Sequence, residues 1–419
     1  MTADIAAARP RRKVLFLSFT YPSSAGTGTQ LRSAALVRML AAEADIHLLV
    51  AGYMESVSGP RDPGLEALCR EIVYFRVPPG EATGGRWPRP KTEAPLLTLP
   101  TIDCPQGTIA GRIAAFYGER RLDSLFVFRF DALHFVCDRL ADFPRRELDL
   151  DELPSRTQEE MGRLEPDAGA AGRDKAAQSA GRLMERMLLP RFHRVFVASA
   201  FEAEEVRRRT GFAGARVLPN IYPDRRPLEQ SAAGGPREIL FVGTLIYPPN
   251  LDAVLYFCRE IFPLIRREKG VSVVFHIVGA GAPEGLDALK TKPGVKFMGY
   301  QEDLEPFYAR AALVAVPLRA GTGTRLKILE AFALGRVVVS TSIGAQGLEV
   351  SDGENILLAD DPEAFAQACI EVMDHPERAA RICAEALRLH RERYSAGALL
   401  RRYSAITAGD EITLPGGAA

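Results

Sequence analysis

The chain alternates between short apolar runs and longer segments in which apolar residues recur at helical spacing. The runs Lys13–Phe19, Glu238–Val242 and Leu313–Val316 are almost continuously apolar, as in parallel strands that are covered on both faces. Each run ends in a loop and leads into a helical segment, for example the one over Gln30–Ala42. This alternation predicts an α/β protein with parallel sheets.

A proline- and glycine-rich stretch divides these predicted elements into two groups. Residues 223–236 contain the run Ser-Ala-Ala-Gly-Gly-Pro, which predicts a linker. We therefore predict a Rossmann-like domain over residues 1–222, a second one over 237–390, and a final helix with a tail over 391–419. The length of 419 residues suits two domains.

Composition and charge narrow the classes of function. Lys and Arg together number 53, as do Asp and Glu, so the formal charge is zero and no general affinity for nucleic acid is expected. The six cysteines include no Cys-x-x-Cys pair, which indicates reduced thiols rather than a metal site or disulfide framework. Without an apolar leader or a long apolar run, the sequence predicts a cytoplasmic protein with no transmembrane segment. Peripheral membrane contact stays open.

The stretch Val314–Ser342 carries the clearest candidate chemistry. Its strand is followed by Ala-Gly-Thr-Gly-Thr, in which Gly321 and Gly323 permit a positive φ and a close approach of a ligand to the backbone. Thr324 is the predicted N-cap of a helix over Arg325–Leu334, and Gly335 its predicted stop. Such a turn presents free N–H groups to an anion such as phosphate.

Two cations in the first turn of that helix strengthen the case for an anion. Arg325 and Lys327 carry the wrong charge for the positive end of a helix dipole, which suggests that a negative ligand belongs there. Further along lies Glu330, a lone acid on an otherwise apolar helix. An ordinary strand–helix unit with a flexible glycine loop is the alternative.

The first domain offers its own candidates. The predicted strand Arg146–Leu153 ends in acids, among them Asp149, which could bind acceptor hydroxyls or act as a base. A solvated acidic turn is the alternative. His134 follows the predicted strand Leu122–Phe130 and is either a residue of the site or a structural histidine on an apolar helix face.

Two long polar segments interrupt the first domain. Residues 78–106 lack periodicity and include the only tryptophan, Trp87. They form either a surface insertion or a flap that faces the acceptor. Residues 155–180 are predicted to form a mobile loop that leads into a helix.

The segment GTGTRLKILEAFALGRVVVSTSIGAQGLEV resembles the nucleotide-sugar site of the GT-B glycosyltransferases of family 4. More closely, it resembles the bacterial sugar transferase branch with the signature GGGTRLKxLEAMAxGxPVVST. The resemblance implies two Rossmann-like domains facing each other across a cleft. The first would bind the acceptor and the second the nucleotide sugar, with the last helix crossing back to the first domain.

The same resemblance implies roles for individual residues. Glu330 would bind the ribose hydroxyls and the loop from Thr322 to Lys327 the diphosphate; the commoner family pattern has a glutamate at the position of Thr322. The predicted catalytic residues are Arg325, Lys327, Asp149 and His134. The predicted donor-binding residues are Gly26, Gly28, Gly243, Thr244, Asn250, Gly279, Gly299, Tyr300, Gly321, Thr322, Gly323, Thr324, Arg325 and Glu330.

The sequence therefore predicts a retaining, metal-independent glycosyltransferase, a monomer or homodimer with no cofactor. Its partners would be a UDP-, GDP- or dTDP-linked sugar and a hydroxyl-bearing acceptor: a saccharide, a lipid-linked sugar or a natural product. Two alternatives stay open. One is another chemistry on the same fold, a nucleotide-sugar epimerase or a phosphorylase. The other is a non-catalytic partner protein.

Overall fold

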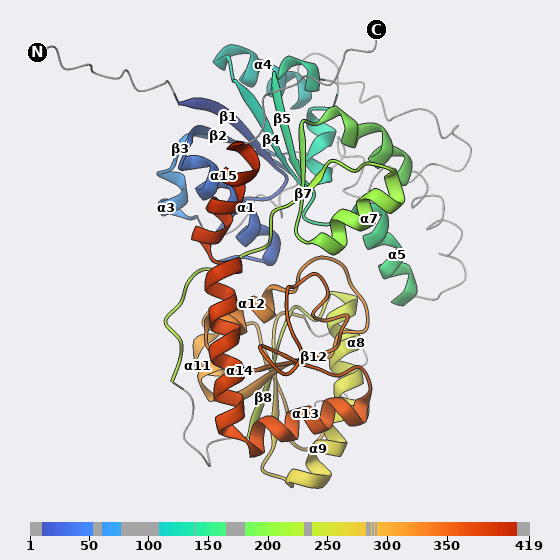
Figure 1. The fold of residues 1–419 in the computed structure, drawn as a ribbon. Helices are drawn as coiled ribbons and strands as arrows, with labels where there is room; N and C mark the ends of the chain where they lie inside the picture. The colour runs from blue at the N-terminus through green and yellow to red at the C-terminus, as the bar shows by residue number, and fades with distance from the viewer. Residues whose placement is uncertain are drawn as a thin grey trace, which may run out of the picture.

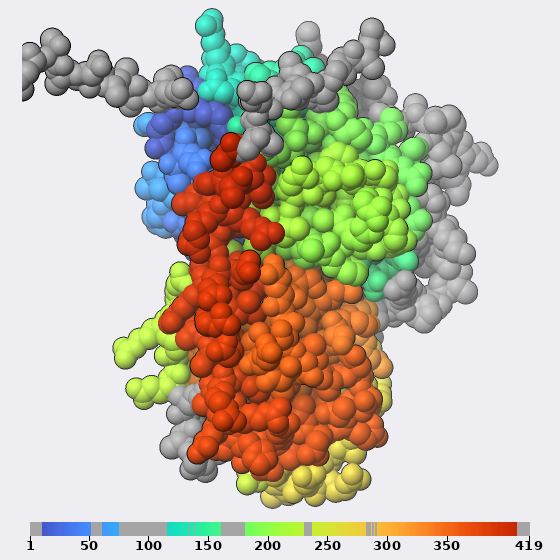
Figure 2. Space-filling view, in the orientation of Figure 1, coloured from blue at the N-terminus to red at the C-terminus, as the bar shows by residue number. Residues whose placement is uncertain are grey.

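The computed structural model describes residues 11–52, 61–76, 109–137, 139–164, 181–229, 237–281, 286, 289 and 291–408. The predicted flap over residues 78–106 and its Trp87 lie outside these ranges, as do part of the predicted linker and the C-terminal tail. Two α/β domains stand one above the other in Figure 1, and Figure 2 shows them as two lobes.

The first domain is built on a seven-stranded sheet in the order β3-β2-β1-β4-β5-β6-β7. Every strand pair is parallel, so that β1, for example, pairs Val14 with Ile46 of β2 and with Ser124 of β4. The strands are β1 (Arg12–Ser18), β2 (Ala44–Gly52), β3 (Cys69–Arg76), β4 (Ser124–Phe128), β5 (Arg145–Asp149), β6 (Arg194–Val197) and β7 (Ala215–Val217). The predicted parallel sheet is confirmed.

Helices pack on both faces of this sheet, which explains the continuous apolar strands. Two buried clusters lie on opposite faces, since Leu15 and Phe16, neighbours in β1, belong to different ones. The helices are α1 (Gly28–Ala41), α3 (Pro63–Glu66), α4 (Ile109–Arg120), η1 (Phe130–Phe135), η2 (Leu140–Asp142), α5 (Pro154–Leu164), residues 181–188, η3 (Leu189–Arg191) and α7 (Ala200–Thr210).

Helix α5 corrects one prediction, because part of the segment expected to be a mobile loop is helical. Pro154 stands at its start, where the missing N–H costs nothing. The buried carboxylate of Glu185 accepts hydrogen bonds from the Ser155 amide and hydroxyl, both at 2.8 Å. Glu185 lies 30 residues further along the chain, so local composition does not reveal this stabilising contact.

The second domain has a six-stranded parallel sheet in the order β10-β9-β8-β11-β12-β13. Its strands are β8 (Glu238–Val242), β9 (Val274–Val278), β10 (Val295–Gly299), β11 (Ala311–Val316), β12 (Val338–Ser340) and β13 (Leu357–Leu358). Its helices are α8 (Pro248–Tyr256), η4 (Phe257–Ile261), α9 (Phe262–Lys269), α11 (Glu305–Arg310), α12 (Leu326–Ala333), α13 (Pro362–Asp374), α14 (Pro376–Leu389) and η5 (His390–Tyr394). The second predicted parallel sheet is therefore also present.

The chain returns to the first domain at its C-terminal end. Helix α14 and η5 pack on the second domain, the backbone turns at Ser395, and α15 (Ala396–Ala408) lies beside α1 (Figure 1). Tyr403 of α15 is fully buried and donates to the carboxylate of Glu147 at 3.0 Å. The two domains are thus connected twice, by the segment before β8 and by the turn before α15.

Candidate active site at the domain interface

The loop between β11 and α12 has the predicted backbone conformation. Gly321 and Gly323 have φ angles of +120° and +72°, so a side chain at either position would be strained. The predicted N-cap is wrong by one residue: Arg325 occupies it, and the helix begins at Leu326. Gly335 ends the helix as predicted, with a φ of +68°.

Arg325 explains why the helix starts late. Its buried guanidinium donates to the carbonyl oxygens of Gly321 at 3.0 Å and Thr322 at 2.9 Å, and to that of Gly323. Burial lowers the pKa of this guanidinium. In this structure Arg325 shapes the loop from within, and its predicted contact with a ligand stays a prediction.

Lys327 is held by neutral groups. Its Nζ donates to Asn250 Oδ1 at 2.8 Å and lies 4.2 Å from the centre of the Phe241 ring. Burial, with a further contribution from the Arg325 charge, lowers the pKa of the ammonium to about 7. A lysine kept in this state gains most from an incoming anion, because an anion would restore its charge.

The carboxylate of Glu330 is held by two phenols. Tyr222, in the segment between the domains, donates to Oε1 at 2.6 Å, and Tyr308 of α11 donates to Oε2 at 2.8 Å. Burial raises the pKa of Glu330, and the two phenol hydrogen bonds oppose that rise. The acid is therefore partnered by hydroxyl groups, which are the groups that a ribose carries.

Three predicted glycines meet at the carboxyl ends of neighbouring strands. The Gly243 amide donates to the Val278 carbonyl and the Gly279 amide to the Gly299 carbonyl, both at 2.9 Å. A Cβ on Gly279 would lie 2.0 Å from the Gly243 oxygen, and one on Gly243 would lie 2.8 Å from Lys327 Nζ. A side chain at Gly279 would collide with the backbone, one at Gly243 would displace Lys327 and Asn250, and the φ of +68° at Gly299 favours glycine.

The remaining predicted residues of the second domain differ in exposure. Thr244 and Tyr300 are exposed, Tyr300 at 71%. Asn250 is buried and donates to the Thr244 carbonyl at 2.9 Å while it accepts from Lys327, so it positions both. The Oγ1 of Thr324 is buried without a hydrogen-bond partner among the described residues.

Helix α1 approaches α12 across the domain interface. A Cβ on Gly28 would lie 3.0 Å from Leu326 Cδ1, and Thr27 and Gln30 form a capping box at the start of α1. A Cβ on Gly26 would lie 2.4 Å from Gln30 Oε1, so this glycine makes room for the box. Because the N-terminal ends of α1 and α12 face each other, their dipoles add a positive potential at this point.

Asp149, a predicted catalytic residue, is buried in the first domain. Both its oxygens accept from Arg32, at 2.8 and 2.7 Å, and its side chain is 0% exposed. Arg32 also donates to Asn220 Oδ1 at 2.8 Å. The structure places Asp149 in a bidentate buried ion pair, an arrangement that stabilises the fold, and its catalytic role stays untested.

The neighbouring acids have different surroundings. Burial raises the pKa of Asp151 to about 6 and that of Glu202 to about 7. The pKa of Glu152 is lowered despite its burial, chiefly because Arg129 donates to its Oε1 at 2.7 Å. Glu152 is therefore the acid of these three whose surroundings favour its ionised form.

The first domain reaches the glycine loop through side chains that the sequence analysis did not single out. Thr157 Oγ1 lies 3.0 Å from Thr322 Oγ1, and Arg156 donates to Gln346 Oε1 at 2.6 Å. Both come from α5, the helix that was predicted to be a loop. Tyr222 and Tyr308 were missed as well, because a lone tyrosine far from the motif gives no local signal.

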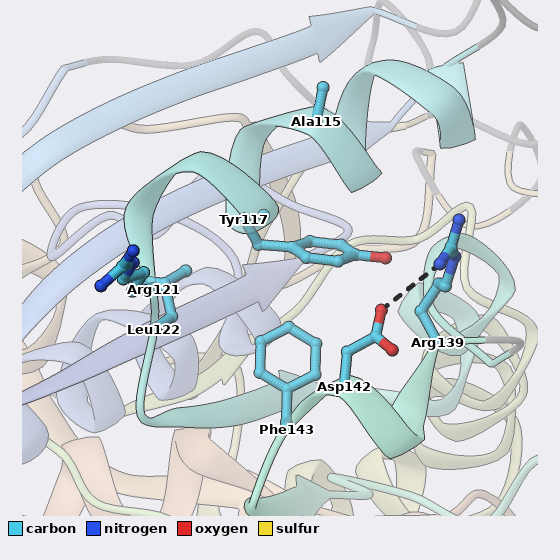
Figure 3. Close-up of a pocket in the computed structure, with 8 residues that line it drawn as sticks. Ala115, Tyr117, Arg121, Leu122, Arg139, Asp142 and Phe143 are labelled. Atoms are coloured by element: carbon cyan, nitrogen blue, oxygen red, sulfur yellow. Dashed lines mark ion pairs between the residues drawn. The ribbon is translucent and has the colours of Figure 1, made fainter.

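The backbone of His134 is part of η1, and its side chain is not among those that the structure describes, so its predicted catalytic role stays a prediction. A hollow of about 460 Å³ is lined by residues of α4 and η2, including Tyr117, Arg139 and Phe143 (Figure 3). It lies near the amino ends of β4 and β5, opposite the edge where ligands of parallel sheets bind.

Sequence comparisons match the part of the chain that contains the glycine loop and α12. The family model for glycosyl transferases group 1 matches residues 236–375. An uncharacterized 44.6 kDa protein from the cps region of Klebsiella pneumoniae is 29% identical over 141 residues, 32% of this chain and 36% of that protein. A D-inositol 3-phosphate glycosyltransferase of Rhodococcus opacus (strain B4) is 28% identical over 263 residues, 56% of this chain and 58% of that one. The chain thus spans between about a third and just over half of these curated relatives.

Solved structures match over nearly the whole chain. Sucrose-phosphate synthase from Thermosynechococcus elongatus has a TM-score of 0.67 at 17% identity, covering 95% of this chain and 98% of that one. The HepE protein of Anabaena, solved with UDP, has a TM-score of 0.64 at 16% identity, covering 95% and 100%. The fold is that of the GT-B glycosyltransferases. The residues that match the glycosyl transferases group 1 model, 236–375, cover nearly all of the second domain of this fold.

Two further observations concern only the described part of the chain. No helix there is both long and apolar enough to cross a membrane. No group of three or more histidine, cysteine or acidic side chains is arranged there to hold a metal ion.

Proposed function

We propose that this protein is a glycosyltransferase that moves a sugar from a nucleoside-diphosphate donor to a hydroxyl-bearing acceptor, with retention of the anomeric configuration. The observation that carries the proposal is the pair Lys327 and Glu330, one turn apart on α12. Both are mostly buried at the domain interface, and both are held by neutral amide or phenol groups. A buried cation and a buried acid with such partners suit a diphosphate and a ribose.

The diphosphate would lie between the start of α12 and Lys327. As the bond from the sugar to the diphosphate breaks, negative charge grows on the leaving oxygen, so cations and N–H groups there stabilise the transition state more than the ground state. Arg325 binds carbonyl oxygens of the glycine loop from within, so the amide groups of that loop are the part of its backbone that would contact the diphosphate. This electrostatic stabilisation favours departure of the nucleoside diphosphate without a lasting covalent intermediate.

Relatives and neighbours support the nucleotide side of the proposal. The match to the group 1 domain over residues 236–375 contains all of α12 and its glycine loop, and one structural neighbour was solved with UDP. A family-4 type, transfer of a hexose, independence of metal and cofactor, a location in the cytoplasm and assembly as a monomer or homodimer stay predictions from the sequence.

The test is thermal unfolding with UDP, GDP and dTDP, followed by product analysis. A nucleotide that binds the native state raises the melting temperature, by an amount set by its concentration relative to Kd. We expect one base to give a clear shift, and the corresponding sugar nucleotide to give a product of unchanged anomeric configuration by NMR. Absence of a shift with all three would overturn the proposal, and an inverted product would overturn retention alone.

A further inference from the structure

One carboxylate of the first domain reaches the glycine loop of the second. Glu152 Oε2 accepts a hydrogen bond from Thr322 Oγ1 at 2.9 Å, although the two residues lie 170 positions apart. The hydroxyl of Thr157 lies 3.0 Å from that of Thr322. One threonine hydroxyl therefore occupies an oxygen of this acid, and a second threonine hydroxyl lies beside the first, directly at the loop proposed to hold the diphosphate.

Glu152 is ionised and partly exposed. Arg129 donates to its other oxygen at 2.7 Å and holds the pKa of the carboxyl low, while the side chain keeps 22% exposure. Asp149 in the same loop region is 0% exposed and has both oxygens engaged by Arg32. Of these two acids, only Glu152 has an oxygen that a ligand could reach without breaking an ion pair.

The backbone around this ion pair is unusual. Arg129 and Asp151 have φ angles of +68° and +56°, a region that side chains other than glycine rarely adopt. The positions lie at the carboxyl ends of the adjacent strands β4 and β5, and their conformations orient the Arg129–Glu152 pair toward the second domain. Strained residues of this kind persist where the surrounding structure requires them.

The chemistry that is missing from the loop is a hydrogen-bond acceptor for sugar hydroxyls. Lys327 and the loop N–H groups are hydrogen-bond donors, which suit the oxygens of a phosphate. They cannot accept the hydrogen bonds that the hydroxyl groups of a sugar donate. An ionised carboxylate accepts such hydrogen bonds strongly. The carboxylate oxygens of Glu330, where ribose is proposed to bind, accept hydrogen bonds from phenol hydroxyls. In the same way, an oxygen of Glu152 accepts a hydrogen bond from the Thr322 hydroxyl.

We propose that Glu152 accepts hydrogen bonds from hydroxyl groups of the transferred sugar, which take the place of the Thr322 and Thr157 hydroxyls. The first domain then supplies the carboxylate that recognises the sugar, while the second supplies the groups that hold the nucleotide. This inference rests on the proposed function. In this proposal the hydroxyl of Thr322 occupies Glu152 in the free protein and is displaced when the sugar binds.

The experiment compares Glu152→Gln with the wild type by calorimetric titration. The probes are UDP, GDP and dTDP, and the matching sugar nucleotides UDP-glucose, GDP-mannose and dTDP-glucose. For the base that binds, we expect the Kd of the nucleoside diphosphate to stay within about twofold, while the sugar nucleotide loses about tenfold in affinity, since hydrogen bonds to a charged acceptor are stronger than those to a neutral amide. The turnover should fall by at least the same factor.

Two further variants separate recognition from folding. Glu204→Gln makes the same chemical change on an exposed side chain that pairs with the neighbouring Arg207, and should leave all affinities unchanged. Thr322→Val removes the competing hydroxyl and should keep or tighten sugar-nucleotide binding. Arg129 keeps Asp131 and Asp151 within 3.6 and 3.5 Å, so Glu152→Gln should still fold.

The outcomes distinguish the two proposals. If Glu152→Gln weakens the nucleoside diphosphate and the sugar nucleotide equally, or neither, the role of Glu152 is overturned and the proposed function stands. If none of the six probes binds the wild type, the proposed function fails, and this inference with it.

Discussion

The two domains hold acids near their interface by opposite chemistry. Glu330 of the second domain is held by the neutral phenols of Tyr222 and Tyr308, whereas Asp149 of the first is held by the guanidinium of Arg32. Hydrogen bonds from neutral groups can be replaced by hydrogen bonds from a ligand at little net cost in free energy. A buried guanidinium cannot lose its carboxylate without being left as an unpaired charge. We therefore predict that Glu330 can exchange its partners for a ligand and that Asp149 cannot.

The largest effect should come from breaking the ion pair of the first domain. We expect Asp149→Asn to lower the free energy of unfolding by about 3–5 kcal/mol, because Arg32 would stay buried without its bidentate partner. Denaturant unfolding measures this, with Asp142→Asn, in an exposed pair with Arg139, as the control. Unchanged stability together with lost turnover would instead make Asp149 catalytic and break the comparison.

Replacing Glu330, the acid of the second domain, should change ligand affinity and leave stability nearly unchanged. In Glu330→Gln we expect the Kd of the nucleoside diphosphate to rise about 10- to 100-fold, through loss of a charged acceptor. The melting temperature of the free protein should change little, because an amide oxygen still accepts from a phenol. Calorimetric titration gives the Kd, and Glu349→Gln on the surface of the same domain is the control. A large loss of stability with intact affinity would contradict the assignment.

The affinity for a sugar nucleotide should depend on pH through Lys327. Its pKa of about 7 in the free protein lies below its usual value, and a bound diphosphate raises it, so binding takes up a proton above neutral pH. Affinity is then full below about pH 7 and falls by up to about tenfold per pH unit above it, until the pKa of the complex is reached. Titrations in buffers of different ionisation enthalpy count the protons.

Arginine at this position provides the control for that pH dependence. An arginine side chain stays charged throughout this range, so Lys327→Arg should flatten the profile even if its affinity is lower. The charged groups nearest to Lys327 are Arg325 and Glu330, and Asn250 and Phe241 are its neutral contacts. A slope that persists in the arginine variant would assign the titration to another group, Glu330 being the first to examine.

The smallest effect concerns the connection between the domains. Tyr403→Phe removes the hydroxyl that α15 donates to Glu147 and should cost about 1 kcal/mol of stability. Nucleotide affinity should not change, since the residue lies in the core of the first domain. Parallel unfolding and titration experiments check both expectations, and an altered Kd would show that α15 communicates with the donor site.

The glycine loop was predictable because its residues are neighbours in the chain. Gly321, Gly323, Lys327 and Glu330 span one strand–loop–helix unit, so their spacing already places them on one edge of the sheet. The start of that helix was misplaced because Arg325 folds back onto the loop carbonyl oxygens, a contact that helix-capping preferences do not include. Likewise, α5 was missed because its start depends on Glu185.

The sequence by itself determined the two parallel sheets and the conformation of the glycine loop, because strand periodicity, glycine conformation and helix ends are local properties. Only the tertiary structure decided which acid has which partner. Asp149 and Glu152 are three residues apart and alike in sequence, yet one is paired with Arg32 in the core and the other reaches Thr322 in the opposite domain. The electrostatic environment of an acid depends on charges brought near it by folding, and those charges come from distant parts of the chain.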